Sequence, residues 1–268
     1  MKYHLYELFI RNIVYMKYRL DEILVIRKMV DSRIKAYKMI VDGKVKVENQ
    51  IVYKPSKKFP LNVNIEIEPL PEMEFVSRGG YKLKEAIEKF NIDVKNKVCM
   101  DIGASAGGFT DCLLKYGAKK VIAIDNGKNQ LHPSLLKNPN VINIEKFNAK
   151  NINLFFQNNS LSKEIEIIAI DVSFISATLI TESLAKVKNE KKLHLIILIK
   201  PNFEINKDER KFLKKGVLKD RKKLILITLR TLKKIRNQGF KFIKIIPSPI
   251  KGDKGNTEFL AYFIKEKL

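Results

Sequence analysis

Residues 98–110 combine the features of a ligand-binding turn. They run from an apolar stretch through three glycines within six positions (Gly103, Gly107 and Gly108) into the start of a helix. Glycine weakens strands and helices, so such a cluster is useful where the backbone turns sharply and a ligand approaches closely. Asp125 ends the next apolar run, 22 residues beyond Gly103. A buried strand that ends in an acid about twenty residues after a glycine turn is typical of sites that hold ribose hydroxyls.

The spacing within this turn excludes two common nucleotide-binding loops. A dinucleotide-binding Gly-x-Gly-x-x-Gly turn would need glycine at Ser105, and no Lys-Ser or Lys-Thr pair follows, as a phosphate loop requires. The order Asp-Ile-Gly-Ala-Ser-Ala-Gly-Gly-Phe instead resembles the first motif of S-adenosylmethionine-dependent methyltransferases. This resemblance implies that the cofactor contacts a set of nine residues: Asp101, Gly103, Ser105, Gly107, Gly108, Phe109, Asp125, Asn148 and Asp171.

Electrostatics gives coherent roles to these residues. Glycines near a helix N-terminus expose backbone amides to the carboxylate of the cofactor. Asp101 can pair with the cofactor ammonium group, and Asp125 can hold its ribose. Asn148 follows a third apolar run, residues 141–144, and is the candidate for reading the adenine, where many methyltransferases carry aspartate.

Two further apolar runs also end in charged residues. Residues 165–170 end at Asp171, and residues 195–199 end at Lys200. Ligands of open α/β sheets bind at the carboxyl ends of the strands, so these side chains are predicted to face the same crevice as the glycine turn.

These residues need a sheet that brings the strand ends together. From residue 77 onward, buried runs of strand length alternate with helical patterns such as residues 78–90, 109–116 and 224–235. This alternation predicts an α/β domain: a Rossmann-like methyltransferase sheet with helices on both faces. The segment 206–244 carries fifteen basic and three acidic residues, about half of the net charge of the chain.

A smaller α+β unit is predicted before this domain. Helical spacing over 20–26, an Asp-Ser cap before 33–41 and a period-two pattern over 45–53 resemble the small RNA-binding domain first seen in ribosomal protein S-four. Residues 17–58 hold twelve basic and five acidic residues. We predict an extension without an assigned role (1–16), an RNA-binding domain (17–62), a linker (63–76) and a methyltransferase domain (77–268). The predicted RNA contacts are Arg19, Arg33, Lys35, Lys38 and Arg78.

The composition agrees with a nucleic-acid partner. The 268 residues carry a net charge of +23, although an AT-rich genome would also enrich lysine over arginine. The sequence offers no apolar run near the ~20 residues that span a bilayer and no signal-peptide core, and its two cysteines lack metal-ligand spacing. We therefore expect a reduced, cytoplasmic protein that binds neither membrane nor metal and needs no obligate protein partner.

Several motifs together resemble the TlyA family of haemolysin-named ribosomal RNA methyltransferases with an FtsJ-like catalytic domain. They are Ser77-Arg78-Gly79-Gly80-x-Lys82, the glycine turn, Asp171-Val172-Ser173-Phe174-Ile175-Ser176 and Ser248-Pro249-Ile250-Lys251-Gly252. The resemblance implies 2′-O-methylation of cytidine in ribosomal RNA or ribosomal subunits, with S-adenosylmethionine as donor. It also implies a catalytic set that falls on Lys82, Asp171, Lys200 and Glu258.

Within this set, Lys200 would contact the ribose hydroxyl as a base or as a stabiliser of the developing alkoxide. Nearby Asp171 and Glu258 favour its charged form, so we prefer the stabilising role. Two alternative hypotheses assign the chain to other functional classes: a membrane-active haemolysin, and an RNA-binding factor with a vestigial methyltransferase site. The lack of a lytic or spanning segment opposes the first, and the complete Lys-Asp-Lys-Glu set opposes the second.

Overall fold

The chain divides into two compact units, which we describe separately. The computed structural model describes residues 17–41, 43–67, 74–188 and 190–267. The first unit ends at Glu72 and the second begins at Met73. Each unit has its own apolar core.

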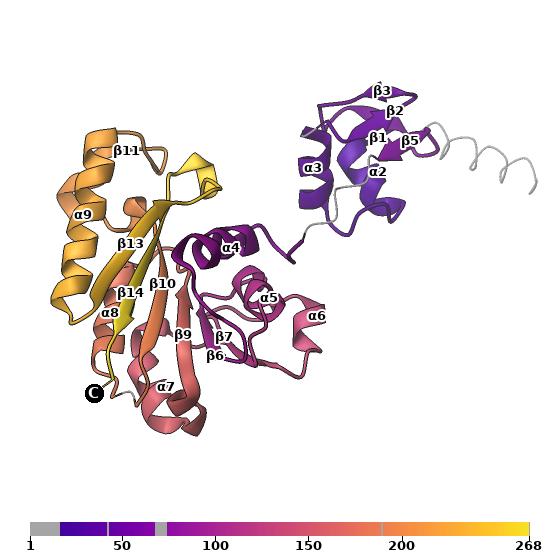
Figure 1. Cartoon of the computed structure of the whole chain (residues 1–268). Helices are drawn as coiled ribbons and strands as arrows, with labels where there is room; N and C mark the ends of the chain where they lie inside the picture. The colour runs from indigo at the N-terminus through magenta and orange to yellow at the C-terminus, as the bar shows by residue number, and fades with distance from the viewer. Residues whose placement is uncertain (1–16, 42, 68–73, 189, 268) are drawn as a thin grey trace, which may run out of the picture. The chain divides into compact units, whose positions relative to one another are not determined.

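The N-terminal unit packs two helices against short strands (Figure 1). Its core is formed by residues such as Leu20, Ile23 and Ile40, which are fully buried. The three-stranded sheet has the order β3-β2-β5, and β1 pairs with β4 in a separate ribbon. The elements are β1 (Lys17–Arg19), α2 (Leu20–Ile26), α3 (Arg33–Val41), β2 (Val45–Val47), β3 (Gln50–Ile51), β4 (Lys58–Pro60) and β5 (Ile65–Ile67).

The predicted domain limits need correction on both sides of the linker. Val63 and Ile65 are buried in the N-terminal core, and β5 pairs with β2, so this unit does not end at residue 62. Phe75 is buried in the core of the second unit, so the linker also ends before residue 76. The predicted extension, residues 1–16, lies outside the described residues.

A seven-stranded sheet forms the centre of the second unit, in the order β13-β14-β10-β9-β6-β7-β8. The five strands from β10 to β8 are parallel, and β14 runs antiparallel to both of its neighbours. The strand order reverses between β6 and β9, which is the switch point where open α/β sheets bind ligands. The strands are β6 (Val98–Ile102), β7 (Lys120–Ile124), β8 (Val141–Ile144), β9 (Ile165–Ile170), β10 (Leu193–Ile199), β13 (Lys241–Pro247) and β14 (Phe259–Lys265).

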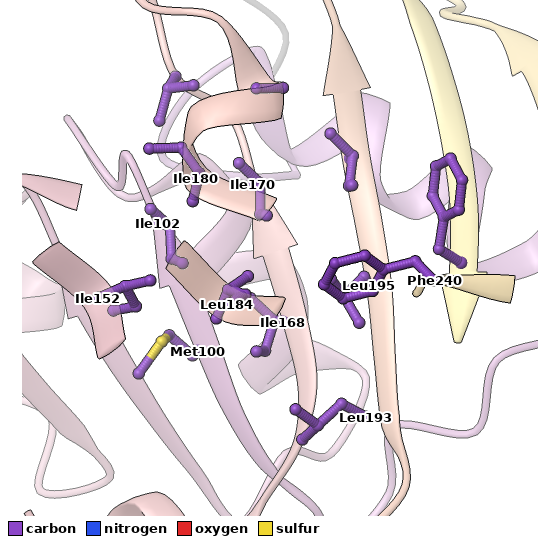
Figure 2. Packing of buried hydrophobic residues seen from close by; sticks show 14 of the residues in the cluster. Met100, Ile102, Ile152, Ile168, Ile170, Ile180, Leu184, Leu193, Leu195 and Phe240 are labelled. Carbon is purple, nitrogen blue, oxygen red and sulfur yellow. The ribbon is translucent and has the colours of Figure 1, made fainter. Parts of the chain in front are cut away.

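Helices cover both faces of this sheet. Successive side chains of a strand point to opposite faces, so the continuous apolar strands place apolar side chains on both. In β9, Ile168 and Ile170 pack on one face, with Met100 and residues of the helices α7 and α8 (Figure 2). Residues of α9 belong to the same cluster. Ile167 and Ala169 pack on the other, against α4 and α5. The longer helices are α4 (Gly79–Phe90), α5 (Gly108–Lys115), α7 (Ile152–Asn158), α8 (Ala177–Ala185) and α9 (Arg221–Asn237).

Short elements complete the second unit. The small antiparallel hairpin of β11 (Leu213–Lys214) and β12 (Val217–Leu218) was not predicted from the sequence. The others are α6 (Pro133–Leu136) and the 3-10 turns η1 (Ala149–Asn151), η2 (Ser160–Glu164), η3 (Pro201–Phe203), η4 (Lys207–Phe212) and η5 (Asp253–Gly255). Among the described residues, no helix has the length and apolar character to cross a membrane.

Candidate active site

The register of the sheet brings the predicted site residues to one edge. Ile102 pairs with Ile170, Ile170 with Ile197, and Ile199 with Phe259. The residues that follow or precede these pairs (Gly103, Asp171, Lys200 and Glu258) therefore lie at neighbouring positions. They line a cavity of about 510 Å³, which Lys82 enters from α4. This volume is in the range of small-molecule sites.

The backbone conformation and the close packing of the turn require glycine. Gly103 and Gly107 have φ angles of +89° and +92°, which other residues rarely adopt. A Cβ atom added at Gly103 would lie 2.3 Å from the Asp171 carbonyl oxygen, and one added at Gly108 would lie 2.2 Å from Ser77 Oγ. The turn thus passes against β9 and the start of α4 without room for a side chain. This packing adds to the reason that the sequence suggested, the close approach of a ligand.

Some of the predicted cofactor residues line the cavity, and others do not. Gly103, Ser105, Gly108, Phe109 and Asp171 belong to the lining, whereas Asp101, Gly107, Asp125 and Asn148 do not. The Asp125 carboxylate accepts hydrogen bonds from the amides of Ser105 (2.8 Å) and Gly127 (2.6 Å), and so braces the turn. The Asn148 side chain accepts a hydrogen bond from the Lys150 amide at the start of η1.

Asp101 is completely buried under the glycine turn. Its Oδ2 accepts a hydrogen bond of 2.7 Å from the Thr110 hydroxyl, and its Oδ1 is buried without a hydrogen-bond donor among the described residues. Burial raises the pKa of Asp101 to about 7; the Thr110 hydrogen bond opposes this shift and the charge of Asp171 adds to it.

We expect this shift to make the ligand-free protein less stable as pH rises from about 4 to about 7. In that window the unfolded carboxyl is ionised, while the folded one still holds its proton, so unfolding releases the proton. The full effect is on the order of 4 kcal/mol. Urea unfolding of Asp101→Asn across this range should show a flatter pH dependence than the parent. The exposed control Asp93→Asn should keep the parent slope, and an unchanged slope for Asp101→Asn would contradict the assignment.

Two lysine–carboxylate pairs face the cavity. Lys82 Nζ lies 2.6 Å from Glu258 Oε2, and both side chains are buried (9% and 4% exposed). Lys200 Nζ lies 2.5 Å from Asp171 Oδ1 and donates a hydrogen bond of 2.8 Å to Ser173 Oγ. The four residues that the sequence assigned to catalysis are thus brought together, and their charges balance one to one.

Three residues at this site were missed from the sequence. Ser173 positions the Lys200 ammonium group. Glu204 is buried and accepts hydrogen bonds from the Ser176 hydroxyl and the Ala177 amide, which ties the loop after β10 to the loop after β9. Phe203 stands at the mouth of the cavity beside Phe174, with 5.2 Å between ring centroids. These side chains follow apolar strand runs, but their partners are about thirty residues away in sequence.

The residues predicted to contact RNA have mixed surroundings. Arg19 and Arg33 both pair with Asp21, at 2.9 Å and 3.1 Å, and Lys35 pairs with Asp31 at 2.9 Å. The arginine pairs hold the pKa of Asp21 below its usual value. The basic face predicted for α3 is therefore partly neutralised within its own unit. Lys38 is exposed, and Arg78 lines the cavity at the start of α4.

Comparison with known families agrees with this architecture. Residues 75–265 match the FtsJ-like methyltransferase family, and residues 19–65 match the S4 domain. The chain belongs to the FtsJ-like methyltransferase family, and within it to the TlyA group. The predicted family and fold class are thereby confirmed.

The relatives cover nearly the whole chain. The chain is 43% identical to Hemolysin A of Brachyspira hyodysenteriae, over 92% of this chain and 99% of that protein. It is 31% identical to the 16S/23S rRNA (cytidine-2′-O)-methyltransferase TlyA of Mycobacterium tuberculosis, over 91% and 88%. A solved structure of a candidate hemolysin from Streptococcus thermophilus superimposes with a TM-score of 0.70 and 30% identity, over 93% of this chain and 89% of that one.

Proposed function

We propose that this protein transfers a methyl group from S-adenosylmethionine to the ribose 2′-hydroxyl of a cytidine in ribosomal RNA. The observation that carries the proposal is the pair of buried lysine–carboxylate contacts, Lys200–Asp171 and Lys82–Glu258, in one cavity with the glycine turn. The FtsJ-like family match supports methyl transfer. The TlyA relatives, which are named for cytidine 2′-O-methylation of rRNA, support this acceptor.

The residues around the glycine turn fit the methyl donor. The first turn of α5 leaves amide groups without helical partners at Gly108, which lines the cavity and can face a carboxylate. The unpartnered Oδ1 of Asp101 lies beneath the same turn and would gain from a cationic group. Ser105 and Asp125 would face the ribose, and Asn148 stays the candidate for the adenine. When bound, S-adenosylmethionine supplies an electrophilic methyl group on a sulfonium.

Lys200 is proposed to act on the acceptor oxygen. Asp171 and Ser173 hold its Nζ at 2.5 Å and 2.8 Å, so the ammonium group has a fixed position at the cavity. A fixed cation can orient the 2′-hydroxyl and stabilise the negative charge that develops on its oxygen during transfer. Holding acceptor and donor in line supplies much of the remaining rate increase. Lys82 and Glu258 form the wall beside this position.

The mouth of the cavity is suited to a nucleoside. Phe174 is 91% exposed and has a φ of +64°. Both the exposure of an aromatic ring to water and a left-handed backbone at a bulky residue are energetically unfavourable. Together with Phe203, Phe174 offers a surface on which an unstacked base can pack. The S4 domain is proposed to bind the RNA that carries this base.

Incubation with labelled S-adenosylmethionine tests the proposal. We expect the protein to label isolated ribosomal subunits or free ribosomal RNA, and primer extension at low nucleotide concentration to stop at one or a few cytidines. A matched reaction with Lys200→Ala controls for contaminating enzymes. No incorporation into any RNA, together with lysis of red cells by the purified protein, would instead favour the haemolysin alternative that the relatives' names suggest.

A further inference from the structure

One wall of the cavity is built from two segments that are distant in sequence. One is the β11–β12 hairpin, which contributes Leu213 and Gly216, and the other is the loop between β13 and β14, which contributes Lys251 and Lys254. Figure 1 shows both at the same end of the sheet, the loop in yellow. The strands that lead to this wall and to the glycine turn, β14 and β6, are separated by β10 and β9 in the sheet.

Asn256 fixes the two segments to each other. It is 6% exposed; its Oδ1 accepts a hydrogen bond of 3.2 Å from the Leu218 amide, and its Nδ2 donates one of 3.1 Å to the Gly216 carbonyl. Gly252 in the same loop packs so closely against Glu258 that a Cβ atom at this position would lie 1.9 Å from Glu258 Oε1. The loop is therefore held both to the hairpin and to the catalytic pair.

Lysines gather on this wall. Lys251 and Lys254 line the cavity, and Lys214 and Lys215 lie on the adjoining hairpin; we call these four the lysine rim. All four are exposed, and no described carboxylate forms an ion pair with any of them. Lys215 and Lys254 also have left-handed φ angles of +52° and +57°. Among the described side chains, the rim thus carries positive charge without a paired carboxylate.

The acceptor of the proposed reaction requires such a charge. The 2′-oxygen and the 3′-phosphate of an RNA nucleotide sit on adjacent ribose carbons, so a phosphate must accompany every 2′-hydroxyl that reaches Lys200. Inside the cavity, Lys82 and Lys200 are each paired with a carboxylate, and Lys200 is assigned to the 2′-oxygen. Positive charge for the phosphate is therefore available only outside these pairs, and among the described lining residues it is found on Arg78, Lys251 and Lys254.

We infer that the lysine rim binds the backbone phosphates that flank the target nucleotide, so that the catalytic domain itself grips the RNA strand in addition to the S4 domain. Phosphate contacts of this kind fix register and orientation without reading sequence. The inference rests on the proposed function for the identity of the acceptor. Gly252, next to Lys251, packs against Glu258 of the catalytic set, whereas the glycine turn follows another strand, β6, so the RNA rather than the carboxylate of the methyl donor is the expected ligand of the rim.

Binding of a short oligocytidylate to the full-length chain tests this inference, because a short single strand reports on the cavity more than on the S4 domain. For Lys251→Gln/Lys254→Gln we expect about tenfold weaker binding and a log–log salt dependence that is shallower by about 0.7 per lost contact. Affinity for S-adenosylmethionine should stay unchanged, which also shows that the variant folds. The control Lys95→Gln/Lys188→Gln removes two exposed lysines beside the amino ends of β6 and β10 and should match the parent.

Three outcomes would overturn the inference. Oligocytidylate binding and salt slope equal to those of the control would show that the rim does not contact phosphate. Weaker binding of S-adenosylmethionine alone would assign the lysines to the methyl donor. Loss of binding to ribosomal subunits with intact oligocytidylate binding would assign the rim to a protein partner. All three are binding measurements, so they are separate from failure of methyl transfer, which would overturn the proposed function.

Discussion

Replacing Lys200 with alanine is expected to lower the single-turnover rate of methyl transfer by about 10²–10³-fold, the usual effect of removing one fixed donor to a developing oxyanion. The side chain is buried and its Nζ is held by Asp171 and Ser173, while the other described lysine buried at this cavity, Lys82, is paired with Glu258. Rapid-quench measurement with saturating labelled S-adenosylmethionine checks this expectation. Binding of the methyl donor should change little, since Lys200 lies two strands away from the glycine turn.

Lys200→Arg separates the two roles that remain open for this residue. Arginine stays protonated, so it can stabilise an alkoxide but cannot accept a proton. Partial activity of Lys200→Arg would support the stabilising role that we prefer. Lys188→Ala, on the exposed surface, is the matched control and should retain the parent rate. Near-normal single-turnover transfer by Lys200→Ala would exclude both roles.

Breaking the second buried pair is expected to affect stability as strongly as activity. Glu258→Gln leaves the Lys82 ammonium group buried without its counter-charge, which typically costs about 3–5 kcal/mol. Denaturant unfolding of the full-length chain should show this decrease in the free energy of unfolding. Methyl transfer should also fall, because Gly252 and its loop pack directly on Glu258.

A double variant distinguishes the pair from its separate residues. In Lys82→Met/Glu258→Gln the buried charge is absent, so most of the lost stability should return while methyl transfer stays low. Additive losses in the double variant would show that the two side chains do not interact in solution. Recovery of full activity would show that the pair serves only the fold.

Much of this architecture could be predicted because the strands are short, nearly continuous apolar runs bounded by charged residues. The residues that follow them, such as Asp171 and Lys200, reach one edge by the parallel register alone. The glycine turn was located for a related reason, since its positive φ angles admit few other residues.

What could not be predicted depends on contacts between distant segments. The β11–β12 hairpin consists of two pairs of residues and is held by Asn256, about forty positions away. The ion pair of Arg33 with Asp21 arises only when α2 and α3 pack together. Likewise, no local pattern shows that Asp101 is sealed beneath the turn while Asp171 faces the cavity.

The identity of the methylated nucleoside is the most direct test of the central claim, that this site methylates a ribose hydroxyl. Ribosomal RNA labelled by the purified protein would be digested completely to nucleosides and separated by chromatography. We predict that the label appears in 2′-O-methylcytidine and is lost with Lys200→Ala. Label in a base-methylated nucleoside, or equal 2′-O-methylcytidine from parent and Lys200→Ala, would contradict the account.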